Sequence, residues 1–88
     1  MFGGREETVR IVFENHLVGV VFDRFGHDIM LYKYDEEHFS IRVRVNVSDQ
    51  FFGWLAGLGS GAVVSSPSNI RREYREFLQK ALDNYKED

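Results

Sequence analysis

Residues 38–47 read HFSIRVRVNV, and this stretch decides the fold because its polar and apolar side chains alternate without a break. Successive side chains of a β-strand point to opposite faces of the sheet. One face therefore holds only apolar residues, namely Phe39, Ile41, Val43, Val45 and Val47. The opposite face holds Arg42 and Arg44, two like charges on neighbouring positions. We predict a central strand that is buried on one side.

The segments before this strand predict two further strands and a helix. Residues 8–14 (TVRIVFE) also alternate, which favours a strand. Residues 15–25 carry apolar side chains at helical spacing, with Asn15 as the N-cap and Gly26 just past the end. Their valines also suit a strand, but we predict a helix. Residues 27–34 (HDIMLYKY) predict the second strand.

The segments after it predict a helix, a short strand and a last helix. Ser48 is a good cap for a helix over residues 49–58 (DQFFGWLAGL). A valine-rich strand follows at residues 62–65. Ser66 as the cap and Pro67 at the first helical position then begin the last helix. Its apolar residues keep helical spacing for four turns, which indicates a helix with one buried face.

The predicted order is β-α-β-β-α-β followed by a helix. This is the ferredoxin-like split βαβ order with an added C-terminal helix, in the α+β class. It predicts a four-stranded antiparallel sheet with helices on one face and an open second face. The 88 residues suffice for one domain, which we place at residues 8–88. Residues 1–7 are rich in glycine and charge, and we expect them to be a tether from a preceding domain.

The sequence holds no pattern typical of a catalytic or metal site. It has no cysteine, which excludes disulfides, thiolate ligands and cysteine nucleophiles. Its three histidines lack metal-binding spacing, and the acids at residues 35–37 lack the spacing of a calcium loop. The net charge of -3 argues against a stand-alone duplex-DNA binder. No apolar run approaches the roughly 20 residues of a membrane span. We expect no enzyme activity, cofactor, metal or membrane partner.

The open face of the predicted sheet is the most informative surface. If the apolar residues of all strands face the helices, this face carries three arginines and two tyrosines: Arg10, Arg42, Arg44, Tyr32 and Tyr34. Basic and aromatic side chains on an open sheet bind single-stranded nucleic acids by neutralising phosphates and stacking on bases. The alternative is that the arginines pair with acids of a covering domain or of a second copy. A one-residue slip in the second strand would also replace Tyr32 by Leu31.

The middle helix offers a second candidate surface. Its apolar residues cover an unusually wide arc, and Trp54 lies at one margin of that arc. We consider Trp54 a candidate interface residue, although burial under the last helix would also explain it. The chain is short and rich in aromatic residues, with eight Phe, four Tyr and one Trp. Both features favour self-association or docking to a neighbouring domain.

Several segments together resemble one family. MFGG followed by ETVRIVF is similar to the junction after a WYL domain. The stretches SIRVRVNVSD, FFGWLAGLGSGAVV and SPSNIRREYREFLQKAL resemble the second half of a WCX domain, the C-terminal extension of WYL transcriptional regulators. The resemblance covers roughly residues 9–85. His27-Asp28 stands where many members carry a His-Pro pair, which leaves the role of that segment open.

The resemblance implies a bacterial, cytoplasmic transcription regulator. A WYL domain would precede residues 1–7, and DNA would be bound only by a winged-helix domain nearer the N-terminus. The module itself would support homodimerisation and effector sensing, with single-stranded nucleic acid or a nucleotide as an effector in some members. The alternative is a free-standing ferredoxin-like module that binds a ligand or RNA by itself, and such a module would not need the tether.

Overall fold

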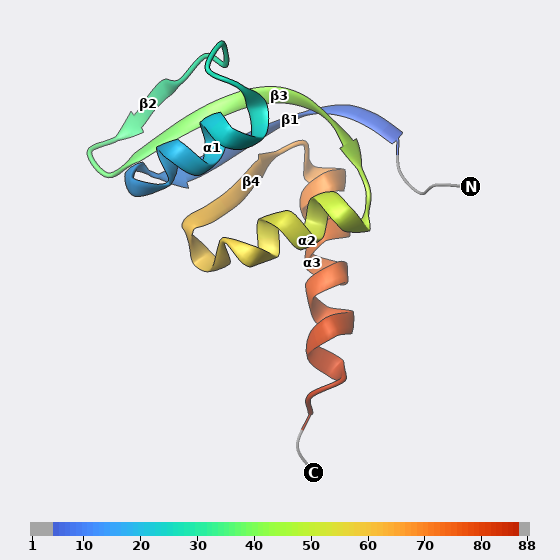
Figure 1. The fold of residues 1–88 in the computed structure, drawn as a ribbon. Coiled ribbons are helices and arrows are strands. Elements are labelled where there is room, and N and C mark those ends of the chain that lie inside the picture. Colours follow the sequence, from blue (N-terminus) through green and yellow to red (C-terminus); the bar gives the residue numbers. More distant parts are fainter. Residues whose placement is uncertain (1–4, 87–88) are drawn as a thin grey trace.

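The strand read first in the sequence is a central strand of the structure. The computed structural model describes residues 5–86, and β3 spans His38–Val47 as predicted. The sheet has four antiparallel strands in the order β2-β3-β1-β4 (Figure 1). Its other members are β1 (Arg5–Glu14), β2 (Tyr32–Asp35) and β4 (Ala62–Ser66). β3 lies between β1 and β2, as a split βαβ arrangement requires, so the predicted fold class is confirmed.

The core begins where β1 and β3 pair. Ile11 lies opposite Ile41, and both side chains are completely buried. Phe13 lies opposite Phe39, and their rings stack with centroids 5.4 Å apart. The predicted apolar face of β3 is therefore the core face, although Val43 is only partly buried.

Three helices cover this face. They are α1 (Val18–Phe25), α2 (Asp49–Gly57) and α3 (Ser68–Asp83), with short 3-10 turns at Asn15–Leu17 and Gly59–Gly61. Each helix contributes buried residues to one apolar cluster: Val21 from α1, Phe51, Phe52 and Leu55 from α2, and Ile70 from α3. Figure 1 shows that the C-terminal part of α3 projects away from the sheet. The predicted division into a covered and an open sheet face follows from this arrangement.

The helix caps were predicted with mixed success. The hydroxyl of Ser48 accepts a hydrogen bond from the N–H of Phe51 at 3.3 Å, so this cap is confirmed. Gly26 ends α1 at φ +90°, a conformation that favours glycine. The cap predicted at Asn15 is wrong, because its amide donates to the carbonyl of Glu36 at 3.1 Å. Asn15 thereby ties the end of β1 to the β2–β3 turn.

The second strand is shorter than predicted. It begins at Tyr32 instead of residue 27, because residues 27–31 form a turn and an irregular segment. The N–H of Ile29 bonds back to the carbonyl of Gly26, and the ring of His27 stacks on Phe22 with centroids 4.7 Å apart. These local contacts replace pairing with β3 along that stretch.

Two further boundaries differ from the prediction. β1 begins at Arg5, so the last three residues of the predicted tether belong to the sheet, while residues 1–4 lie outside the described part of the chain. Arg5 pairs with Val47 in register and forms ion pairs with Glu7 and Glu73. Ser66 does not cap the last helix, because it is still paired with Arg10 in the sheet.

Truncation of Ile41 should test the assignment of the two faces. Ile41→Ala removes a side chain that is 0% exposed, and we expect a loss of about 2–5 kcal/mol in unfolding free energy. The neighbouring Arg42→Ala lies on the open face and should change it by less than about 0.5 kcal/mol. Urea unfolding of both variants measures the difference. Equal effects would show that the faces are assigned wrongly.

Candidate functional site

The structure brings the five predicted residues together on one face of the sheet. Arg10 lies directly opposite Arg42, and Arg44 lies two positions further along β3. Tyr32 pairs with Ser40, whose side chain shares a face with Arg42, so Tyr32 and not Leu31 lies on this side. We call the surface formed by Arg10, Arg42, Arg44, Tyr32 and Tyr34 the open face.

The middle of the open face has a buried floor. Val12 and Ser40 are cross-strand partners there, and they are only 7% and 1% exposed although no helix packs on this side. The guanidinium of Arg10 lies 5.9 Å from the ring centroid of Tyr34. Because β3 separates the strands of these two residues, this contact spans β3. Such a cation–π contact contributes about 0.5–1 kcal/mol at an exposed position.

Within the described part of the chain, only one of the arginines on the open face has a counter-charge. Arg44 Nε lies 2.8 Å from Glu6 Oε1, an exposed pair worth about 0.2–1 kcal/mol. Arg10 contacts the ring of Tyr34 instead of an acid. Arg42 is exposed, and within residues 5–86 it forms no ion pair. Among the described residues, Arg42 is therefore an exposed arginine without a counter-charge that lies directly opposite Arg10.

The sequence analysis missed Glu6 as part of this surface. Glu6 was assigned to the tether, whereas β1 includes it opposite Asn46. The signal was present, because the alternation of β1 continues upstream and puts Glu6, Thr8 and Arg10 on the same face. Extending the period of two to Arg5 would have found it.

A polar turn borders the open face. Asp35 Oδ1 lies 2.7 Å from His38 Nδ1 and accepts a hydrogen bond from the N–H of Glu37 at 2.8 Å. The hydrogen bond from His38, followed by the one from the backbone, lowers the pKa of Asp35 below its ordinary value. The ring of His38 also meets Tyr34 edge to face at 6.3 Å. The ionised Asp35 thus holds His38, whose ring contacts Tyr34.

Trp54, the candidate interface residue, is half-buried beside α1. Its indole packs against the rings of Phe13, Phe25 and Phe51, and the guanidinium of Arg24 lies 5.1 Å from its ring centroid. The aromatic contacts of Tyr74 and Phe77 of α3 are with Phe52. The rings around Trp54 thus come from β1, α1 and α2, and its interface role stays a prediction.

The chemistry available on the open face is binding. Within residues 5–86, no group of three or more His, Asp or Glu side chains is placed to hold a metal ion. In the same part of the chain, no helix combines the length and the apolar character needed to cross a membrane. Guanidinium groups and tyrosine rings together suit a ligand that carries both negative charge and flat rings.

Comparison with known protein families identifies the family of this chain. A sequence model of the WCX domain matches residues 5–82. The chain belongs to the WCX domain family. WCX is the C-terminal extension found in WYL-domain transcriptional regulators, and it is a regulatory domain with no known catalysis. The matched segment begins at the first residue of β1. No curated protein and no solved structure gives a significant match to the chain.

Acidification should remove the contribution of Asp35 to the stability of this WCX domain. Its folded-state pKa lies below the ordinary value of about 3.9, so ionised Asp35 stabilises the folded state at neutral pH. That contribution is lost as pH falls through the folded-state pKa. Urea unfolding of wild type and Asp35→Asn should show a gap at neutral pH that closes in strong acid. Asp28→Asn, another exposed carboxylate, is the control, and a gap independent of pH would contradict the assignment.

Proposed function

We propose that this WCX domain is a non-catalytic regulatory module of a WYL-type transcription regulator that senses an anionic effector on its open face. The observation that carries the proposal is Arg42, exposed, next to Arg10 and without a counter-charge among the described residues. Membership in the WCX family supplies the regulatory context. DNA binding would belong to a winged-helix domain elsewhere in such a regulator, in the bacterial cytoplasm.

Charge favours an anionic partner for Arg42. Like charges directly opposite each other in a sheet are destabilising, and Arg10 and Arg42 are such a pair. Salt and solvent reduce the repulsion between the two arginines, but only a nearby negative charge makes their arrangement favourable. Because Glu6 is engaged by Arg44, the described part of the chain leaves this role to a ligand or another chain.

The tyrosines favour a nucleic acid or nucleotide over a simple anion. Tyr32 and Tyr34 are 48% and 53% exposed beside the arginines, so each ring has a free surface. A base stacked on such a ring contributes about 1–3 kcal/mol, and this energy depends little on the sequence. Single-stranded nucleic acid offers both bases for stacking and phosphates for the arginines, and some four-stranded sheets bind it by stacking bases on aromatic side chains. Acids of a WYL domain or of a second copy are the competing partners.

Replacing Arg42 should weaken binding of single-stranded nucleic acid and reduce its salt dependence. The probe is a fluorescein-labelled oligothymidine, titrated with the 88-residue chain over a salt series. Loss of one phosphate contact should lower the slope of log K against log salt by about 0.7. Tyr34→Leu should weaken binding but leave this slope unchanged, because stacking releases no counterions.

Lys80→Ala is the matched control for this experiment, since it removes one exposed positive charge from α3. Its binding should equal that of wild type. If Arg42→Ala also binds as wild type does, the effector proposal is wrong. If Arg42→Ala instead loses self-association, the open face is a protein interface.

We further propose that the module contributes to a homodimer. A chain of this length buries only about 60–65% of the surface of its unfolded form. Met30, Tyr32 and Tyr34 also expose apolar area in and near β2.

Sedimentation velocity over a rising concentration series should show an increasing sedimentation coefficient. Trp54→Phe preserves the aromatic packing but shortens the exposed edge of the ring, and it should weaken association if Trp54 lies in the interface. A strict monomer at every concentration would contradict dimerisation through this module.

A further inference from the structure

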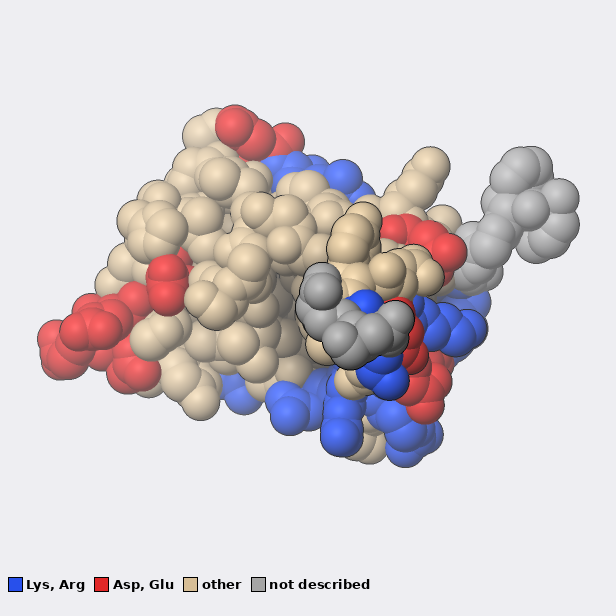
Figure 2. Space-filling model, turned by 90° about the horizontal axis from the view of Figure 1, so that it is seen from below, with Lys and Arg blue, Asp and Glu red and all other residues tan. Residues whose placement is uncertain are grey.

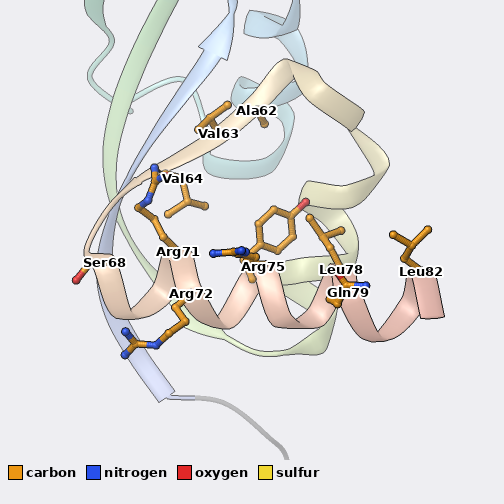
Figure 3. A pocket seen from close by; sticks show the side chains of 11 residues that line it. Ala62, Val63, Val64, Ser68, Arg71, Arg72, Arg75, Leu78, Gln79 and Leu82 are labelled. Atoms are coloured by element: carbon orange, nitrogen blue, oxygen red, sulfur yellow. Dashed lines mark hydrogen bonds between the residues drawn. The ribbon is translucent and has the colours of Figure 1, made fainter. Parts of the chain in front are cut away.

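A second basic surface lies between the edge strand β4 and α3. The two elements diverge from Ser68 and leave an open groove of about 630 Å³ (Figure 3). Strand residues Ala62, Val63 and Val64 form one wall. The other wall is a face of α3, and Figure 3 shows the side chains of Arg71, Leu78 and Leu82 pointing from this helix toward the β4 side.

The α3 wall is basic at one end and aliphatic at the other. Arg71 and Arg75 are one helical turn apart near the beginning of α3, and Leu78 and Leu82 continue the same stripe. Arg71 Nη1 donates a hydrogen bond to the carbonyl of Val64 at 2.8 Å, which fixes its guanidinium at the narrow end. The leucines are 41% and 61% exposed. The groove therefore offers a fixed positive end and an uncovered aliphatic end.

Among the residues that the structure describes, no acid balances the arginines of this groove. Its lining includes Arg71, Arg72 and Arg75 but no Asp or Glu. Within residues 5–86 none of the three forms an ion pair. The three acids of the same helix are engaged or placed differently: Glu73 pairs with Arg5, Glu76 lines a different hollow, and Asp83 accepts a hydrogen bond from Gln79 of the lining at 2.8 Å. In Figure 2 many of the Lys and Arg side chains lie along the lower edge of the molecule, while others lie at the top and on the right beside acidic side chains.

We propose that this groove binds a short acidic segment of a partner protein that also carries aliphatic side chains. Carboxylates fit the fork of an arginine through two parallel hydrogen bonds, and aliphatic side chains would cover Leu78 and Leu82. Arg71 already donates to the carbonyl of Val64 at the edge of β4, and the proposed contacts are therefore made through side chains.

The aliphatic part of the groove favours a peptide over a nucleic acid. Bases need a free aromatic surface on which to stack. The aromatic side chain in the lining is Tyr74, and its ring packs against Phe52 and Phe77 with centroids 5.3 and 6.3 Å away. The open face has the reverse composition, with exposed tyrosines beside its arginines. The two basic surfaces of the domain thus suit different ligands.

The test uses a fluorescein-labelled peptide of sequence EDELSLL and the whole 88-residue chain. Arg75→Glu should weaken binding by about tenfold or more, as expected when a charge-assisted contact becomes a repulsion. Lys80→Glu makes the same change in net charge on the same helix but lines the other hollow, and it should bind as wild type does. Circular dichroism establishes that both variants remain folded.

Control peptides separate the two parts of the groove. A peptide with lysines in place of the acids should not bind, and one with serines in place of the leucines should bind more weakly. Equal losses in Arg75→Glu and Lys80→Glu would mean general charge attraction and would overturn the proposal. The proposal would also be overturned if the peptide shows no saturable binding. It would be overturned as well if the groove binds oligothymidine instead of the peptide and Arg75→Glu abolishes that binding. Arg42→Ala should leave peptide binding unchanged, which keeps this result independent of the open face.

Discussion

The antiparallel pairing of β1 with β3 is the constraint on which the rest of the structure depends. It runs the full length of both strands, from Arg5 opposite Val47 to Glu14 opposite His38. The pairing puts Ile11 against Ile41 on the core face, where both are completely buried. A slip of one residue would turn every apolar side chain of β3 outward, so burial of this face fixes the register.

The same register creates the functional surface. Because the period of a strand is two, burying Ile41 forces Arg42 outward, and burying Ile11 forces Arg10 outward beside it. The repulsion between these arginines is thus a consequence of how the core is built. The chain offsets part of it with the ring of Tyr34 and supplies Glu6 to Arg44, but Arg42 stays uncompensated among the described residues. The pairing of β1 with β3 thus both packs the core and produces the candidate binding surface.

The sequence predicted what depends on local periodicity, and it failed where contacts distant in the chain decide. Strict alternation gave β3 its bounds and the faces of Arg42 and Arg44. Ser48 was recognisable as a cap because its bond to the N–H of Phe51 is local. Asn15 was mistaken for a cap because its partner, Glu36, lies 21 positions away. Ser66 was misassigned for the same reason, since pairing with Arg10 holds it in β4.

The net charge of this domain is a poor guide to what its surfaces bind. The chain carries -3 overall, yet its positive charges are concentrated on the open face and on α3. Acidic side chains form a cluster at one tip in Figure 2, where Figure 1 places the β2–β3 turn. At physiological salt the field of a charge decays over about 8 Å, and the longest dimension of the domain is 43 Å. A ligand responds most to the charges within one screening length. At Arg42 these include Arg10 on the paired strand, and at Arg75 they include Arg71 one helical turn away.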